Sequence, residues 1–185
     1  MARLFSIKPA ITFRGRTFKG LRGLAGKPLH PPLTDIPVAA YMFALVFDVI
    51  SFFSTGELAA NMYNAATYVL IGGLIVSIPT SLTGFWDWWK STQAHTQAWR
   101  TANWHMAVML TVTTLVVVNL LARGLDDGSV NAVGMILSVV VGGLVAYGAT
   151  YGGSLVFDYG FNVETSGDHP AWHESEEDVL PGQDK

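Results

Sequence analysis

Histidine and aspartate side chains flank the apolar windows of the chain, and they carry the strongest chemistry that the sequence offers. They are His30, Asp35, Asp87, His105 and Asp158, with His95 on the connection between the second and third windows. If the windows cross a membrane, these residues lie on the side of the two chain ends. A neutral imidazole can ligate a metal or a haem iron, and a carboxylate can fix its tautomer. The sequence therefore predicts a cofactor-binding set of His30, Asp35, Asp87 and His105 for haem b, a metal or a quinone headgroup. The expected ligands of a metal ion are His30, His95 and His105.

Each of these residues also has an ordinary structural interpretation. Asp35 shortly precedes a proline, and both an acidic cap and a proline in the first turn are favoured at the start of a helix. A lone histidine at a membrane interface, such as His105, is usually only hydrogen-bonded. In the tail, His169 and His173 have a helical spacing that Pro170 allows only in a first turn, so a docking tail for another protein is favoured over a metal site. The sequence leaves the cofactor and structural interpretations open.

Asp48 is the only charged residue inside the apolar windows. An ionised carboxylate in a membrane costs several kcal/mol on insertion scales, unless it becomes protonated. Three- and four-residue spacing puts it on one helical face with Pro37, Tyr41, Ala44 and Phe52. We therefore expect Asp48 to point into the bundle, toward Asn119 or Thr113. Its role is then a structural hydrogen bond, proton or cation handling, or simple exposure near the outer interface.

The elements that must position these residues are four apolar windows at residues 36–54, 63–84, 104–122 and 130–157. The whole chain of 185 residues is 50% hydrophobic and 14% charged, yet these windows hold only one charge. At 1.5 Å per residue, each can cross a hydrocarbon layer of roughly 30 Å. The predicted fold class is an all-α membrane protein with four transmembrane helices packed as a bundle. Such segregation argues against a water-soluble domain, disorder and nucleic-acid binding. The absence of cysteine excludes disulfides and a Cys-ligated iron–sulfur cluster.

The distribution of Lys and Arg predicts the orientation. Most of them precede the first window, Lys90 and Arg100 lie between the second and third, and only Arg123 lies between the third and fourth. By the positive-inside rule, both termini are cytoplasmic. The predicted divisions are a basic interfacial segment at 1–29, the transmembrane domain at 30–160 and an acidic cytoplasmic tail at 161–185.

Small and aromatic residues predict how the helices pack and where the interface lies. Glycines recur in the fourth window, including Gly148 and Gly152, and favour close packing within the chain over a homo-oligomer interface. Most of the tryptophans, Trp104 among them, fall between the second and third windows, as in an aromatic belt, with cofactor stacking as the alternative. Comparison of the first two windows with the last two reveals no convincing internal repeat.

Three short stretches resemble a known family. The stretch 26–37, which contains His30-Pro31-Pro32-Leu33, resembles the His-Pro-Leu opening motif of the bacterial membrane family called domain of unknown function 2231. Gly84-Phe85-Trp86-Asp87 and Trp104-His105-Met106-Ala107 are similar to its Gly-x-x-Asp and His-Ala elements. The resemblance covers roughly residues 26–160 and implies the bacterial cell membrane as the location. Asp35 stands where many members carry a second histidine. Members are found fused or adjacent to Rieske-type ferredoxin domains, so the resemblance implies a separate redox partner for this cysteine-free chain.

These features together favour an integral membrane module that serves as an anchor or accessory subunit of a redox or electron-transfer assembly. Its partners are then the lipid bilayer and a Rieske-type ferredoxin, with no nucleic acid. A small proton-coupled transporter centred on Asp48 and a purely structural membrane subunit are the alternatives. No phosphate-binding loop, nucleophile motif or HExxH zinc motif indicates an enzyme.

Overall fold

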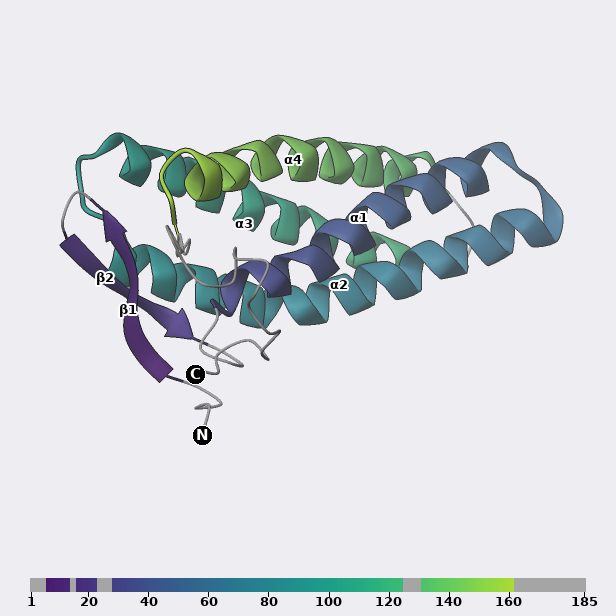
Figure 1. The fold of residues 1–185 in the computed structure, drawn as a ribbon. Helices are drawn as coiled ribbons and strands as arrows, with labels where there is room; N and C mark the ends of the chain where they lie inside the picture. Colours follow the sequence, from purple (N-terminus) through teal and green to yellow (C-terminus); the bar gives the residue numbers. More distant parts are fainter. Residues whose placement is uncertain (1–5, 14–15, 23–27, 125–130, 162–185) are drawn as a thin grey trace, which may run out of the picture.

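The computed structural model describes residues 6–13, 16–22, 28–124 and 131–161, most of which form four long helices (Figure 1). The helices are α1 (His30–Phe53), α2 (Gly56–Ser91), α3 (Gln97–Gly124) and α4 (Ala132–Phe157). Each holds an 18-residue window with a mean hydropathy of 1.7 to 2.0, and each is long enough to cross a membrane. The predicted bundle of four membrane-spanning helices is therefore confirmed.

Three helices, α1, α2 and α3, are longer than the apolar windows that predicted them, whereas α4 is slightly shorter than its window. α1 begins at His30 because Pro31 and Pro32 lie in its first turn, where a backbone N–H has no helical partner to lose. Its N-cap is Leu29, so the interpretation of Asp35 as a helix cap is wrong. At its C-terminal end, α3 continues to Gly124. This extension places Arg123 inside a helix, whereas the sequence analysis placed it in a loop.

The helices form a ring in chain order and alternate in direction. α1 packs against α2 and α4, and α3 packs against the same two helices, so α1 and α3 occupy opposite corners. The beginnings of α1 and α3 and the ends of α2 and α4 consequently lie together (Figure 1). We call this the hairpin end, because the N-terminal strands also lie there. The other end, where α1 passes into α2, is called the opposite end.

A β-hairpin precedes the bundle. It consists of β1 (Ser6–Phe13) and β2 (Arg16–Arg22), which pair antiparallel from Phe13↔Arg16 to Ser6↔Arg22. β2 lies beside α2. The sequence analysis described this segment only as basic and interfacial, and did not predict the hairpin. Two segments rich in β-branched and aromatic residues, separated by a short Arg-Gly link, are nevertheless typical of a hairpin.

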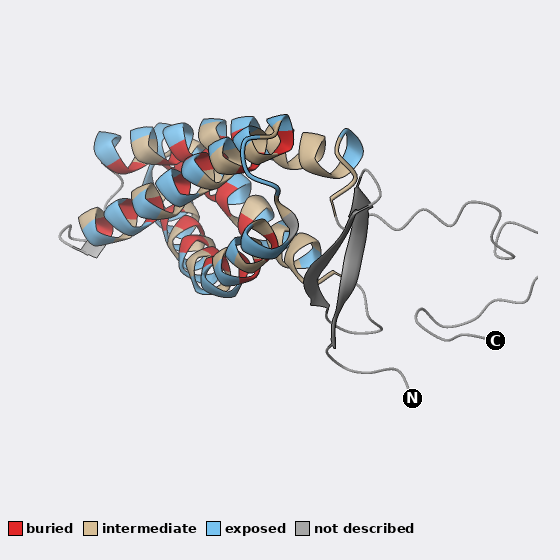
Figure 2. Cartoon of the chain, turned by 90° about the vertical axis from the view of Figure 1, so that its left-hand side faces the viewer, coloured by how far each residue is buried: buried red, intermediate tan, exposed pale blue. Residues whose placement is uncertain are grey.

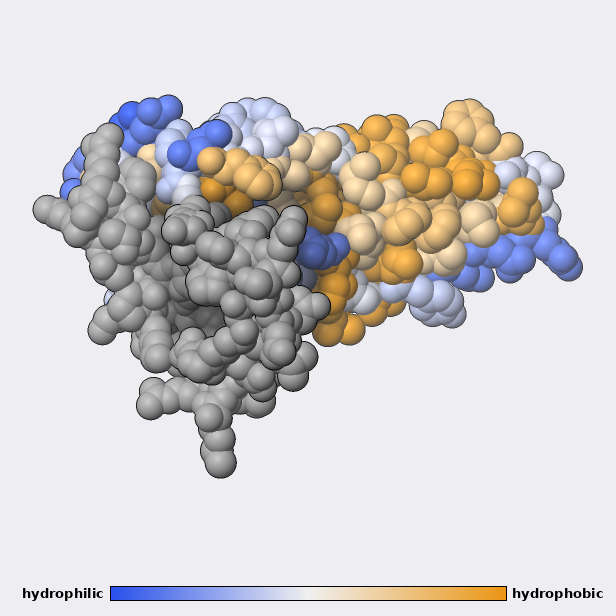
Figure 3. All heavy atoms as spheres, in the orientation of Figure 1, coloured by the Kyte–Doolittle hydropathy of each residue, from blue (hydrophilic) through white to orange (hydrophobic). Residues whose placement is uncertain are grey.

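The interior of the bundle is narrow and its surface is apolar. The buried core contains Tyr41, Ala44, Leu70, Val112, Val116, Val141 and Val145. Figure 2 shows the buried residues on the sides of the helices that face one another, with exposed residues outside. Many exposed side chains are large and hydrophobic, such as Phe43, Ile75 and Leu82. Figure 3 shows an apolar band along the helices, as expected of a surface that contacts lipid.

The buried positions of the α1–α2 and α3–α4 pairs follow the same spacing. In the odd-numbered helices they are Pro37, Tyr41, Ala44 and Asp48 of α1, and Val112, Val116, Asn119 and Arg123 of α3. In the even-numbered helices they are Ala66, Leu70, Gly73, Ser77 and Thr80 of α2, and Gly134, Ser138, Val141, Val145 and Gly148 of α4. α1 and α3 run in the same direction at opposite corners, so the two pairs are related by an approximate twofold axis along the bundle. The matching residues differ in type, which is why no repeat was found in the sequence.

Several glycines allow the helices to approach closely. A Cβ atom on Gly73 would lie 2.8 Å from the Tyr41 ring, and one on Gly142 would lie 2.6 Å from a methyl group of Leu45. These positions confirm the predicted packing within the chain. Gly143, by contrast, has nothing within 4 Å of a built Cβ.

Candidate functional site

His30 is held at the hairpin end by α2. Its ring nitrogen Nδ1 lies 3.0 Å from the carbonyl oxygen of Thr80 and 3.4 Å from Thr83 Oγ1. A carbonyl can only accept a hydrogen bond, so Nδ1 carries the proton. The imidazole packs directly on Gly84, where a Cβ atom would lie 2.6 Å from His30 Cε1. Gly84 therefore provides the space that the ring occupies.

His105 is held in the same way by α4. Its Nδ1 lies 2.9 Å from the carbonyl oxygen of Gly148 and therefore donates to it. A Cβ atom on Gly152 would lie 3.1 Å from His105 Cε1. In both halves of the bundle, a histidine near the start of one helix donates to a carbonyl of the next helix and packs on the glycine four residues later. The two histidines are thus equivalent under the approximate twofold axis.

The two imidazoles form one electrostatic cluster with Asp87. Asp87, which is only 5% exposed, and His105 lie within electrostatic range of His30. With Nδ1 donating, Nε2 carries the lone pair of each neutral imidazole. Within the described part of the chain, no hydrogen bond engages either Nε2 atom. The hairpin end thus holds two neutral imidazoles and a buried carboxylate, and imidazole nitrogens of this kind can ligate iron.

The other predicted site residues lie apart from this cluster. Asp35 is exposed on α1, and Asp158 is exposed at the C-cap of α4. His95 is exposed on the turn before α3, where it has a φ of 67° and its ring lies 5.8 Å from that of Trp99. Among residues 28–124 and 131–161, no three His, Asp or Glu side chains are grouped to hold a metal ion. His169 and His173 lie outside the described residues.

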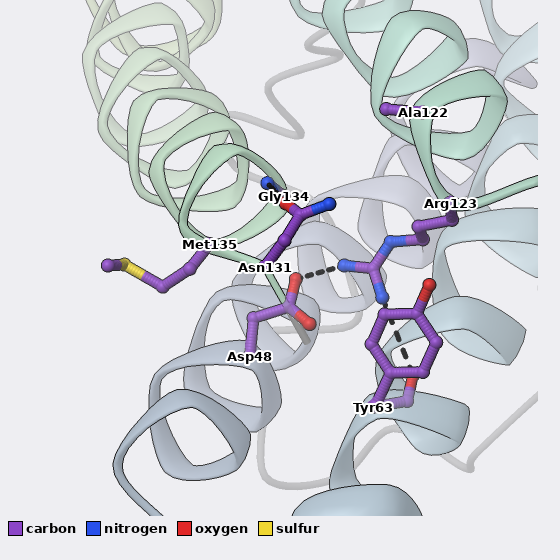
Figure 4. Close-up of a pocket in the computed structure, with 7 residues that line it drawn as sticks. All are labelled: Asp48, Tyr63, Ala122, Arg123, Asn131, Gly134 and Met135. Carbon is purple, nitrogen blue, oxygen red and sulfur yellow. Dashed lines mark hydrogen bonds and ion pairs between the residues drawn. The ribbon is translucent and has the colours of Figure 1, made fainter. Parts of the chain in front are cut away.

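A second polar cluster surrounds Asp48 near the opposite end (Figure 4). Asp48 Oδ2 forms an ion pair with Arg123 and accepts a hydrogen bond of 2.5 Å from Ser138 Oγ. Arg123 also donates to Asn119 Oδ1 at 3.0 Å and to Thr67 Oγ1 at 3.1 Å. Its guanidinium carbon lies 4.8 Å from the centre of the Tyr63 ring. All four helices therefore contribute to this cluster, which also contains a 2.9 Å hydrogen bond from Asn119 Nδ2 to Ser138 Oγ.

The Asp48 cluster partly confirms the sequence analysis and partly corrects it. Asp48 points into the bundle at 1% exposure, and Asn119 belongs to its network, as predicted. Thr113 does not, because its hydroxyl donates to the carbonyl of Met109 on its own helix. The main partner, Arg123, was missed, since the third window was ended one residue before it. Its four-residue spacing from Asn119 was the available signal, because it continues the buried face of α3.

The two clusters lie at different depths. Residues 30 and 48 of α1 are separated by roughly 27 Å along a helix that rises 1.5 Å per residue, which is close to the thickness of a hydrocarbon core. The pocket lined by Asp48, Tyr63 and Arg123 has no room for a water-sized molecule. These contacts favour a structural role for Asp48, whereas the histidine cluster retains unused donor atoms.

Comparison with known proteins gives one match. Neither a curated protein nor a solved structure matches the chain. A family model described as predicted membrane protein (DUF2231) matches residues 26–165, which include all four helices and both clusters. The chain therefore belongs to the DUF2231 family of predicted membrane proteins.

Proposed function

We propose that this protein is a membrane redox module that binds b-type haem between His30 and His105. The observation that carries the proposal is the matched arrangement of the two imidazoles: each donates Nδ1–H to a backbone carbonyl, and no other described residue makes a hydrogen bond to its Nε2. Metal-ligating histidines commonly donate their other N–H to a carbonyl or carboxylate, which fixes the tautomer and orients the ring. Bound haem supplies one-electron transfer at the hairpin end.

The surroundings of the two histidines support the same proposal. The two imidazoles occupy matching positions in the two halves of the bundle, and both would serve as nitrogen ligands of a haem iron. Gly84 and Gly152 remove side chains from the places where the rings lie. The negative charge of Asp87 acts on His30 electrostatically. Asp35, which is exposed, has no such contact with either ring among the described residues.

The cellular setting is part of the proposal. Lys90, Arg100 and the basic hairpin share one end of the bundle, which the positive-inside rule assigns to the cytoplasm of a bacterial cell. Arg123, the basic residue described near the opposite end, is engaged by Asp48 and does not weaken this asymmetry. The module then acts as an anchor or accessory subunit. Its electron-transfer partner, such as a Rieske-type ferredoxin, carries its own cluster, because this chain has no cysteine.

An absorption spectrum of the purified protein tests the proposal. The chain is expressed with a haem supply, extracted in mild detergent and reduced with dithionite. We expect a Soret band and the split visible bands of six-coordinate haem b. His30→Ala and His105→Ala should each abolish the six-coordinate spectrum, because each removes one axial ligand. His95→Ala is the matched control, since its exposed ring lies beside Trp99, and it should leave the spectrum unchanged. A featureless spectrum from folded protein would overturn the proposal.

A further inference from the structure

The outer face of the α3–α4 pair carries a hydrogen-bonded chain of three aromatic side chains. Trp104 Nε1 lies 3.1 Å from Tyr147 Oη, and Tyr147 Oη lies 2.9 Å from Tyr151 Oη. The two tyrosine rings are perpendicular, with centres 5.2 Å apart. Trp104 is 50% exposed and Tyr147 is 45% exposed. This chain is therefore an aromatic surface open to the surroundings of the bundle near the hairpin end.

A count of donors shows that one hydroxyl is unused. An indole N–H can only donate, so Trp104 donates to Tyr147. The two phenols share one further hydrogen bond, whichever of them is the donor. Three donors therefore make two bonds, and one phenolic O–H has no acceptor among the described residues. Both phenols are partly exposed, so this O–H is accessible to a ligand that offers an acceptor oxygen.

The aromatic chain is not a general requirement of the bundle, because the matching half lacks it. The positions equivalent to Trp104, Tyr147 and Tyr151 are Leu29, Pro79 and Thr83. The aromatic chain also adjoins the histidine cluster. Trp104 precedes His105 in the sequence, and Tyr147 precedes Gly148. The 2.9 Å hydrogen bond joins His105 to the carbonyl of Gly148.

We infer that Trp104, Tyr147 and Tyr151 form a binding site for the headgroup of a membrane quinone. A quinone offers a flat ring for the exposed aromatic surface, carbonyl oxygens for the unused O–H and an apolar tail for the lipid phase. α4 carries no charged residue, which favours a neutral headgroup over a phosphate. Arg100, one turn before Trp104, already donates to the carbonyl of His95 at 3.4 Å. The redox purpose of the site rests on the proposed haem function, but binding itself does not need haem.

Titration of the full chain in nanodiscs with decylubiquinone tests the inference, with quenching of tryptophan fluorescence as the readout. We expect saturable binding that the Tyr147→Phe/Tyr151→Phe variant weakens about fivefold or more, because both hydroxyls are lost while the rings remain. Tyr68→Phe is the control, since Tyr68 is equally a surface tyrosine, at 71% exposure on α2. Native mass spectrometry of the same samples identifies the bound molecule.

Equal affinity of the double variant and the parent protein would overturn the inference. So would retention of a phospholipid, in place of the quinone, that depends on the two hydroxyls. The absorption spectrum of the same preparation tests the haem proposal independently of quinone binding. Hydroxyl-dependent quinone binding without a Soret band would support the site and reject the haem.

Discussion

Asp48→Asn should destabilise the bundle strongly, because it leaves the Arg123 charge without its counter-ion. Both side chains are buried, with 1% and 7% of their residues' surface exposed. Breaking a buried pair by removing one partner costs about 3–5 kcal/mol. Arg123 retains its hydrogen bonds to Asn119 and Thr67 and its contact with the Tyr63 ring. We therefore expect the free energy of unfolding to fall by about 3 kcal/mol, the lower end of this range.

A double-mutant cycle separates the ion pair from other effects of the substitutions. Arg123→Met removes the charge and retains an unbranched, though shorter, side chain. The double variant Asp48→Asn/Arg123→Met has no unpaired charge. Its free energy of unfolding should therefore exceed the value predicted by adding the two single-variant effects, by about 2 kcal/mol or more. Ser138→Ala is the matched control. It removes the hydrogen bond that Ser138 donates to Asp48 and the one that it accepts from Asn119, each worth about 0.6 kcal/mol in a membrane bundle.

The free energy of unfolding can be measured by titration of the detergent-solubilised protein with SDS, followed by tryptophan fluorescence. Reversibility is checked by dilution of the SDS. The reasoning is refuted if the effects of Asp48→Asn and Arg123→Met add within about 0.5 kcal/mol, since residues that do not interact behave in that way. It is also refuted if Asp48→Asn costs no more than Ser138→Ala.

Two further predictions concern the glycines and the orientation. Gly84→Ala should lower the free energy of unfolding by about 1–3 kcal/mol, because its Cβ would lie 2.6 Å from the His30 ring. Gly143→Ala should not lower it, because a Cβ there has nothing within 4 Å. The SDS titration compares the two variants. His95→Cys should be labelled by a membrane-impermeant maleimide only after cells are opened, and Thr55→Cys should be labelled in intact cells. The reverse pattern would place the hairpin end outside the cytoplasm.

Much of the fold could be predicted from local sequence. Windows almost free of charge and long enough to cross a bilayer predict membrane helices, because a lipid-facing segment has to satisfy its own backbone and avoid charges. The inward direction of Asp48 followed from its spacing relative to Tyr41 and Ala44 on one face of α1. The helix ends were less predictable, since apolar windows mark the hydrocarbon core, whereas α1 and α3 continue into more polar sequence at His30 and Arg123.

The candidate site was predicted by residue type but not by arrangement. The sequence placed His30, Asp35, Asp87 and His105 at one level of the membrane, yet a level does not define a side of the bundle. In the structure, Asp87 and His105 lie within electrostatic range of His30, whereas Asp35 is exposed. That His30, Asp87 and His105 share a binding site stays a prediction. The tautomer of each imidazole depends on a carbonyl of another helix, and no local pattern encodes that contact.

The sequence by itself determined that this protein has four membrane helices, an inward carboxylate and imidazoles near one end. It could do so because hydropathy and helical spacing are local properties. Only the tertiary structure decided that Arg123 is the partner of Asp48 and that the two helix pairs match about a twofold axis. Both depend on how distant helices are placed against one another, and helices in lipid are positioned by close packing and a few polar contacts that hydropathy does not record.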